Sequence, residues 1–294
     1  MSEGKNSTVD KALLSVKYSA LAFACGQAPL LWILLESQWE WTSLLWRLAT
    51  AYLLILIVGK SLFPPFYSVW WRAATTGLGV CSGLLLFFCR CDQWAFGLYL
   101  GLLFTFHFLE FAVTGLTNPF NLSTDSFLLN HSLQYWLAAM ASWTEYFIEL
   151  YFFPHLKVRP EVVVLGLAVC VLGEILRKAA MFHAGNSFSH IVQSSKKNDH
   201  VLVTSGVFSL VRHPSYLGWF LWSLGTQIVL SNPICLIIYG FVSWTFFNER
   251  IYIEEHSLLN FFGQDYQLYQ KRVPTGIPGI LGFIPPFTIS RSEN

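Results

Sequence analysis

Eight long apolar runs constrain the fold of this chain more than any other feature. They are separated by short polar segments and cover residues 14–35, 41–59, 68–89, 94–115, 127–152, 161–181, 215–230 and 233–249. A helix that crosses a lipid bilayer needs about 20 mostly apolar residues. Only 12% of the residues are charged, about half of the share in ordinary soluble domains. We therefore predict an all-α, polytopic integral membrane protein with about eight transmembrane helices.

The last two apolar runs are shorter than the others, and Ser231-Asn232-Pro233 lies between them. An Asn-Pro pair favours a turn, and proline disfavours the helical conformation in the residue before it. We therefore predict that 215–230 and 233–249 form a tight helical hairpin.

The distribution of basic residues predicts the orientation of the chain. Eight spans leave both termini on one side of the membrane, which then holds 14 of the 18 Lys and Arg residues. The other side holds four, Arg47, Arg90, Lys157 and Arg159. Because basic residues accumulate on the cytosolic side, we expect both termini in the cytosol. The net charge of +1 gives no electrostatic argument for a nucleic-acid partner.

The polar residues that could carry chemistry gather in the second half. Residues 182–214 form a long polar connection, and the tail from about residue 250 has a pattern typical of an interfacial amphipathic helix. We therefore divide the chain into 1–160, transmembrane helices that act as a scaffold, and 161–294, which contains the hairpin, the tail and the candidate site.

One group of ionisable residues lies inside the apolar runs and could carry chemistry. Its members are His107, Glu110, Glu145, Glu149 and Glu174. Ionisable side chains within a membrane are costly and often functional. The sequence has no repeated histidine box and no Glu-x-x-His pair, so we expect polar contacts between helices here and no metal.

Small residues in the apolar runs are expected to serve packing. The six cysteines are Cys25, Cys81, Cys89, Cys91, Cys170 and Cys235. None belongs to a Cys-x-x-Cys pair, so we interpret them as buried apolar residues without a disulfide framework or zinc site. Gly79 and Gly83, and likewise Gly97 and Gly101, have the four-residue spacing of close helix packing, either within the chain or between two copies.

The densest polar motif is Arg212-His213-Pro214-Ser215-Tyr216, at the start of an apolar run. Proline fits the first turn of a helix, and the free N–H groups of a helix start can bind a carboxylate or phosphate. The motif fits an anion-binding site, and equally the start of an ordinary membrane helix.

A second motif contains Arg250 and Glu254. The two residues share a helix face because they are four positions apart. They could form a surface ion pair, or a site that offers one cationic and one anionic contact to a zwitterionic ligand and a carboxylate.

Over about residues 174–280 the sequence resembles the isoprenylcysteine carboxyl methyltransferase family of the endoplasmic reticulum membrane. The resemblance rests on the order and spacing of Gln193, His200 to Gly206, Arg212 to Tyr216, Gly225 to Gln227, Ser231 to Pro233, Glu254-Glu255, Phe261 to Gly263, Tyr266 and Lys271 to Gly276. The first half is similar only as a series of hydrophobic helices.

The resemblance implies an S-adenosylmethionine-dependent enzyme with a cytosolic cofactor pocket in its C-terminal half. It would methylate the free carboxylate of the C-terminal prenylcysteine of processed CaaX proteins and release S-adenosylhomocysteine. Its partners would be this prenylated cysteine and the lipid bilayer, with no metal and no nucleic acid.

The family's site residues map onto this sequence one by one. Cofactor contacts are implied for Gln193, His200, Val201, Leu202, Val203, Phe208, His213, Pro214, Ser215, Tyr216 and Glu254. The catalytic residues would be Glu254 and Arg250, and Arg250 would position the substrate carboxylate. Phe208 departs from the pattern, because a tyrosine is expected there. Phenylalanine keeps an aromatic face for adenine but offers no hydroxyl.

Two alternative functions fit parts of the sequence. Phospholipid N-methyltransferases and NADPH-dependent sterol reductases share a similar C-terminal pattern, but the runs Arg250 to Glu255 and Lys271 to Pro274 fit the carboxyl methyltransferases better. A non-catalytic transporter would explain the ionisable residues in the apolar runs. The absence of an internal repeat argues against a transporter built from inverted halves.

Overall fold

The computed structural model describes residues 2–34, 41–88, 92–129, 133–157, 159–193, 195–196 and 200–284. Within these ranges the chain consists of helices and connecting loops, with no β-strand, so the predicted all-α fold class is confirmed. Cys89 and Cys91, which were expected to be buried, lie outside the described ranges. So do three of the basic residues counted for the orientation in the membrane, Arg90 on one side and Lys197 and Arg291 on the cytosolic side.

Each predicted apolar run corresponds to one long helix. The long helices are α1 (Ser2–Leu34), α2 (Trp41–Leu62), α3 (Tyr67–Phe88), α4 (Trp94–Thr117), α5 (Leu133–Phe152), α7 (Pro160–Ala184), α8 (Pro214–Val229) and α9 (Pro233–Phe262). Shorter elements are α6 (Pro154–Lys157), α10 (Gln264–Arg272) and the 3-10 turns η1 (Pro64–Phe66), η2 (Pro119–Asn121), η3 (Thr124–Phe127), η4 (Gly185–Ser187) and η5 (Gly206–Ser209). By length and hydropathy, three segments of the described chain could cross a membrane: Ser43–Leu62, Pro64–Phe88 and Trp94–Thr117.

Proline and glycine set the limits of the helices around the candidate site. Helices α7, α8 and α9 have Pro160, Pro214 and Pro233 at their first position, where the missing N–H breaks no helical hydrogen bond. Helices α7 and α9 end before Gly185 and Gly263, whose φ angles are +51° and +53°. Glycine adopts positive φ without the steric cost of a Cβ.

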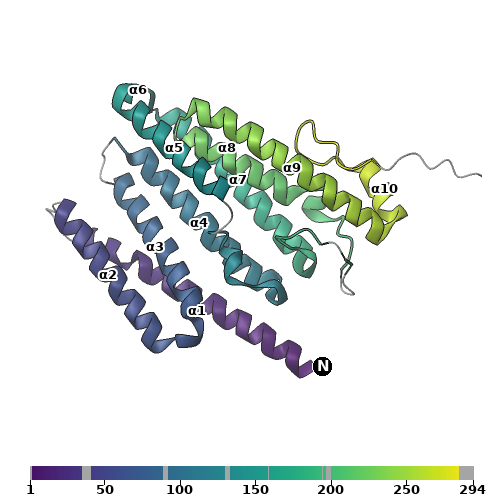
Figure 1. Ribbon diagram of the computed structural model, residues 1–294, viewed down its shortest axis with the longest axis horizontal. Coiled ribbons are helices and arrows are strands. Elements are labelled where there is room, and N and C mark those ends of the chain that lie inside the picture. The colour runs from purple at the N-terminus through teal and green to yellow at the C-terminus, as the bar shows by residue number, and fades with distance from the viewer. Residues whose placement is uncertain are drawn as a thin grey trace, which may run out of the picture.

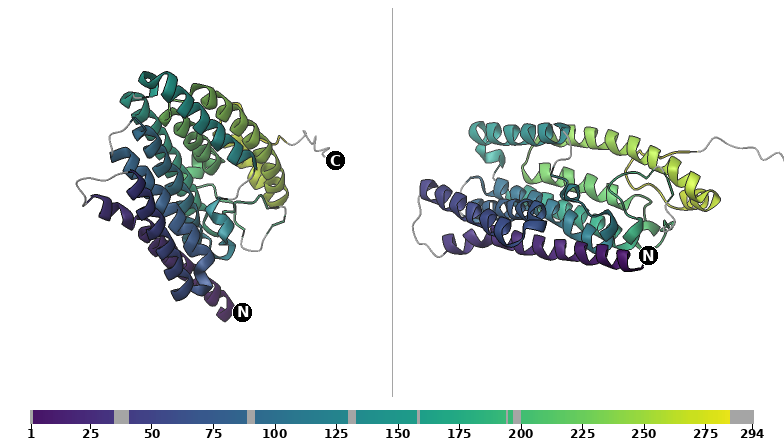
Figure 2. Two further views of the ribbon diagram at one scale, coloured as in Figure 1. Left: turned by 60° about the vertical axis from the view of Figure 1, so that its left-hand side comes forward. Right: turned by 60° about the horizontal axis from the view of Figure 1, so that its bottom comes forward.

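The long helices run roughly along one direction and form two groups. Figure 1 shows α1, α2 and α3 on one side and α7, α8 and α9 on the other, with α4 in contact with both groups. The start of α1 lies at the same end of the bundle as α10, as Figure 2 also shows. The loop between α7 and α8 lies at this end as well, next to the end of α9.

At the opposite end, α5 and α6 hold the turn between α8 and α9. Lys157 is fully buried and donates hydrogen bonds to the carbonyls of Leu230 and Ser231 (3.0 and 2.8 Å) and pairs with Glu149 at 2.6 Å. Glu145 accepts two backbone N–H groups from the first turn of α9, at 2.7 and 2.6 Å. Glu145 and Glu149 therefore make the polar contacts between elements that were expected from the sequence.

Helix α9 is longer than predicted. The sequence suggested a separate interfacial helix from about residue 250, but α9 continues without a break to Phe262, so the predicted break is wrong. Residues 241–262 contain no proline or glycine, and nothing in their local sequence ends a helix. At 1.5 Å per residue, the 30 residues of α9 extend over about 45 Å. Arg250 and Glu254 are thus carried by one rigid element.

Candidate functional site

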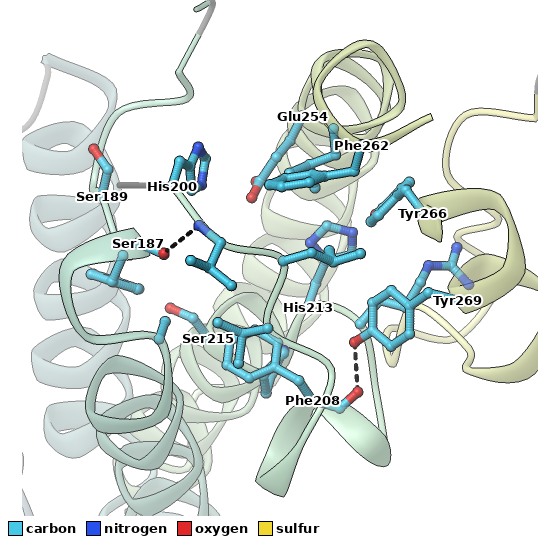
Figure 3. Close-up of a pocket in the computed structure, with 18 of the residues that line it drawn as sticks. Ser187, Ser189, His200, Phe208, His213, Ser215, Glu254, Phe262, Tyr266 and Tyr269 are labelled. Carbon is cyan, nitrogen blue, oxygen red and sulfur yellow. Dashed lines mark hydrogen bonds between the residues drawn. The ribbon is translucent and has the colours of Figure 1, made fainter. Parts of the chain in front are cut away.

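A cavity opens at the end of the bundle where α7 ends, α8 begins and α9 meets α10 (Figure 3). It contains about 710 Å³ of space, a volume that includes the solvent at its open mouth. Figure 3 shows the loop residues Ser187, Ser189 and His200 on one side, Glu254 and Phe262 of α9 above, and α10 on the other side.

The structure brings together nearly all residues for which cofactor contacts were predicted. This cavity is lined by His200, Val201, Leu202, Val203, Phe208, His213, Pro214, Ser215, Tyr216 and Glu254. Gln193 lines a smaller cavity that shares His200, Tyr216 and Glu254 with the first. Arg250 lies one helical turn before Glu254 and contacts Tyr216. Their roles toward ligands remain predictions.

One wall of the cavity is aromatic. Phe208, Phe262, Tyr266 and Tyr269 contribute rings to it. The Tyr269 hydroxyl donates a hydrogen bond to the carbonyl of Phe208 at 2.5 Å (Figure 3). Burial raises the pKa of Tyr269 to about 12, so this hydroxyl stays protonated at neutral pH. Such a wall can stack against a flat heterocycle.

Tyr216 connects the two charged residues of α9. Its hydroxyl donates to Glu254 Oε2 at 2.5 Å and accepts a hydrogen bond from Arg250 Nε at 2.9 Å. Arg250 Nη2 donates to the carbonyl of His190. Among the described residues, Arg250 and Glu254 form no ion pair with each other, although their spacing allowed one. Tyr216 thus separates an anionic group from a cationic group at the edge of the cavity.

A fully buried carboxylate, Glu255, lies behind the cavity wall. Its Oε1 accepts hydrogen bonds from Arg212 Nε at 2.8 Å and from His213 Nε2 at 3.0 Å. Burial alone would raise its pKa, but the contacts with His213 and Arg212 outweigh burial and lower the pKa to about 2. Glu255 therefore stays ionised and fixes the imidazole of His213 in the cavity wall.

The C-terminal segment 273–284 closes the site from behind. The N–H of Phe283 donates to Glu255 Oε2 at 2.9 Å, and Arg212 Nη2 donates to the carbonyl of Leu281 at 3.2 Å. Gly282 has a φ of +78°, and a Cβ there would lie 1.9 Å from Glu255 Oε2. Only glycine allows this segment to approach the carboxylate so closely.

The start of α8 offers fewer free N–H groups than the sequence suggested. The backbone N–H groups of Arg212 and His213 donate to the carbonyls of Pro274 and Thr275, at 2.7 and 3.1 Å. Tyr216 N–H turns back to the carbonyl of His213 at 3.1 Å. In the first turn, the N–H of Ser215 has no acceptor within the described part of the chain. An anion here would be held by this N–H, the helix dipole and nearby side chains.

Sequence reasoning missed several residues of the site. Tyr269, Ser187 and Ser189 line the cavity, and Glu255 was noted only as part of a motif with Glu254. A helix turns by about 100° per residue, so neighbouring glutamates must face different surroundings. That periodicity was the available signal, but it could not show which glutamate faces inward.

Cysteine, histidine and carboxylate side chains are the groups that could hold a metal ion. In the part of the chain that the structure describes, no three of them lie close enough to hold a metal ion. Cys81, Cys170 and Cys235 are buried and unpaired with other cysteines, and Cys25 is half-buried.

Known proteins are similar to this chain over most of its length. The profile of the isoprenylcysteine carboxyl methyltransferase (ICMT) family matches residues 164–260. The chain is 45% identical to the protein-S-isoprenylcysteine O-methyltransferase of Xenopus laevis over 273 residues, which cover 90% of this chain and 95% of that protein. It is 51% identical to the Homo sapiens enzyme of the same name over 219 residues, 74% of this chain and 77% of that protein.

The fold is similar as well. A solved structure of the eukaryotic intramembrane Ras methyltransferase ICMT matches with a TM-score of 0.85 and 41% sequence identity. The match covers 94% of this chain and 99% of that one. Because both the sequence and the fold agree over nearly the whole length, the chain belongs to the isoprenylcysteine carboxyl methyltransferase family.

Proposed function

We propose that the cavity binds S-adenosylmethionine and that the chain uses it to esterify the C-terminal prenylcysteine carboxylate of processed CaaX proteins. Membership of the family makes this chain an isoprenylcysteine carboxyl methyltransferase, which determines the reaction class. The cofactor and the roles of individual residues are the parts that we infer from the site.

The residues of the cavity fit this cofactor. S-adenosylmethionine, when bound, supplies an electrophilic methyl group and also carries an ammonium, a carboxylate and an adenine ring. Glu254 offers a carboxylate for the ammonium, and the start of α8 beside Ser215 suits the carboxylate. The aromatic wall that includes Phe208 suits the adenine.

Arg250 is suited to hold the substrate carboxylate. Its Nε donates to the hydroxyl of Tyr216 and its Nη2 to the carbonyl of His190. The third nitrogen, Nη1, makes no hydrogen bond with the described residues. The α-carboxyl group has a reference pKa of about 3.5, so the substrate is ionised at neutral pH and needs no general base. Arg250 would therefore act by orienting the carboxylate.

The observation that carries the proposal is the position of Tyr216. Its hydroxyl contacts both Glu254, the proposed partner of the cofactor, and Arg250, the proposed partner of the substrate. The two binding sites therefore meet at a single side chain. Such proximity allows a methyl donor and an acceptor to be held in contact, which is the main requirement of this reaction.

The membrane explains the size of the scaffold. A prenyl chain gains about 0.8 kcal/mol per buried CH₂ in a bilayer, so we infer that the substrate enters sideways from the lipid.

We also infer the orientation of the chain. All eight long helices would span the endoplasmic reticulum membrane, with both termini in the cytosol. Residues 1–160 would form the scaffold, and 161–294 the methyltransferase region. Protection of a terminal tag from protease in intact microsomes would contradict this orientation.

Separate measurements of binding and turnover test the two roles. We expect Glu254→Ala to weaken cofactor binding by roughly 10- to 100-fold, the value of a hydrogen bond to a charged group. Arg250→Ala should leave cofactor affinity within about twofold and lower kcat by on the order of 100-fold. Calorimetry with S-adenosylhomocysteine and a methyl-transfer assay report the two effects. Glu249→Gln, an exposed carboxylate on the same helix, is the matched control.

Loss of cofactor binding in a folded Arg250→Ala protein would contradict this assignment of roles. Binding of NADPH in place of S-adenosylhomocysteine would favour a reductase.

A further inference from the structure

Glu110 is a fully buried carboxylate on α4, in the scaffold half of the chain. Four hydrogen bonds reach its two oxygens. Arg177 donates from Nε to Oε1 at 2.6 Å and from Nη2 to Oε2 at 2.8 Å. Lys178 donates to Oε1 at 2.5 Å, and His190 Nε2 bonds to Oε2 at 2.8 Å. One side chain of α4 thus binds α7 and the loop that follows α7.

Two short paths lead from Glu110 to Arg250. In the first, the side chain of His190 is bound to Glu110, and the carbonyl of the same residue accepts a hydrogen bond from Arg250 Nη2. The position of this carbonyl is therefore coupled to the bond between the imidazole and the carboxylate.

The second path runs through α8. Arg177, which is held by Glu110, donates from Nη1 to the hydroxyl of Ser215 at 2.8 Å and to its carbonyl at 3.3 Å. The next residue, Tyr216, accepts the hydrogen bond from Arg250 Nε. Glu110 thus supports both acceptors that fix the Arg250 guanidinium.

Helix α4 also fixes the backbone of the same loop at its C-terminal end. The side chain of Asn118 donates to the carbonyls of Asn186 and Phe188, at 3.1 and 2.7 Å. His190 follows directly in this loop. The loop is therefore attached to α4 at two points, by Asn118 through its backbone and by Glu110 through His190.

We propose that Glu110 is a positioning residue for Arg250 that acts through His190 and Arg177. The proposal rests on the role of Arg250 in orienting the substrate carboxylate. A carboxylate is required because all four contacts to Glu110 come from donors, and both oxygens accept. A glutamine would turn an N–H group toward Arg177 or His190, so that the hydrogen bond from that residue would be lost.

The test compares variants of the full-length protein in detergent or lipid. We expect Glu110→Gln and His190→Ala to lower kcat by roughly 10- to 100-fold, because small displacements of a positioning group have effects of this size. The affinity for S-adenosylhomocysteine should change by less than about threefold, because neither residue lines the main cavity. His190→Gln retains a donor for Glu110 and should recover most of the activity.

A neighbouring carboxylate provides the matched control. Glu174 also contacts Lys178, at 3.1 Å, but in the described part of the chain it forms no hydrogen bond with Arg177 or His190. Glu174→Gln should therefore keep kcat within about twofold of the unsubstituted protein. The double variant Glu110→Gln/His190→Ala tests whether the two residues act together. If they do, its fold-loss in kcat should be smaller than the product of the fold-losses of the two single variants.

Normal turnover in His190→Ala, or equal losses in His190→Ala and His190→Gln, would overturn the proposal. The two His190 variants carry the test even if Glu110→Gln fails to fold, because His190 is partly exposed. Arg250→Ala separates this failure from a failure of the proposed function. If Arg250→Ala turns over normally, the role of Arg250 is wrong. If only Arg250→Ala is impaired, the role of Glu110 is wrong.

Discussion

Glu254 and Glu255 are adjacent in the sequence but have different surroundings. Glu254 lines the cavity and accepts a hydrogen bond from Tyr216. Glu255 is fully buried behind the wall and binds Arg212 and His213. Glu254 therefore faces the space that a ligand would occupy. Glu255 instead fixes the residues of the cavity wall.

The pKa of Glu255 predicts how stability depends on pH. Its pKa of about 2 lies below the ordinary glutamate value of 4.5, so its contribution to stability is present above about pH 4.5 and is lost as the pH falls toward 2. The difference corresponds to roughly 3 kcal/mol at neutral pH. Glu255→Gln should therefore unfold at lower temperature at pH 7, and its deficit should shrink as the pH falls from 4.5.

Thermal unfolding of the purified protein across this pH range measures the deficit. Glu249→Gln, on the exposed face of α9, should show no deficit at any pH. A deficit of Glu255→Gln that is the same at pH 7 and pH 3 would show that the charge of Glu255 is not what stabilises the site.

At this scale, the residues of the site were predictable only where a motif identified them. The resemblance located His213, Tyr216 and Glu254. Nothing in the sequence indicated that Glu110 would meet Arg177, because the two are 67 residues apart on different helices. Such pairs follow from the packing of helices, which local patterns do not encode.

At the scale of elements, glycine contacts bring α7 and α8 together. Gly173 and Gly218 face each other, and a Cβ on Gly218 would lie 2.6 Å from the carbonyl oxygen of Gly173. Gly166 and Gly225 make similarly close approaches at a spacing of seven residues from Gly173 and Gly218. This close packing places Arg177 beside Ser215, and it was not noticed in the sequence.

Substitution of Gly218 tests this contact. Gly218→Ala would force a methyl group against backbone atoms that cannot move independently, so we expect a loss of about 1–3 kcal/mol and lower activity. Gly101→Ala is the control, because a Cβ there meets no atom within 4 Å. Thermal unfolding should separate the two variants clearly. Equal stability would mean that α7 and α8 are not packed through these glycines.

The glycine spacings noted in the sequence were only partly informative. Gly83 and Gly97 do contact each other across α3 and α4, with a Cβ on either one 2.5 Å from the carbonyl oxygen of the other. This is packing within the chain, one of the two possibilities that the spacing left open. A Cβ on Gly101, which belongs to the same pattern, would meet no atom within 4 Å, although the backbone nitrogen of Gly101 would lie 2.8 Å from a Cβ on Gly83. The period shows that a close approach is possible, but not where it occurs.

At the scale of the whole molecule, hydropathy predicted the existence of all eight long helices and the approximate limits of most of them. Helix α1 begins at Ser2, well before the predicted residue 14, because its first turns are polar. Hydropathy could not predict that α9 would continue past residue 250, because the polar residues Asn248 to Glu255 resemble a membrane boundary. It also could not show that the scaffold half is hydrogen-bonded to the loop after α7. Glu110 of α4 and Asn118, which directly follows α4, connect the two halves. The division at residue 160 stays a prediction, and these hydrogen bonds cross it.

The most direct test of the whole account is methyl transfer by the purified protein. The protein would be mixed with S-adenosylmethionine labelled in its methyl group and a farnesyl-cysteine analogue with a free carboxylate. We predict a base-labile labelled ester that is absent when the carboxylate is blocked and is strongly reduced by Glu254→Ala. If folded protein that binds the cofactor forms no ester, or if the label appears on a phospholipid amine instead, the proposed function is contradicted.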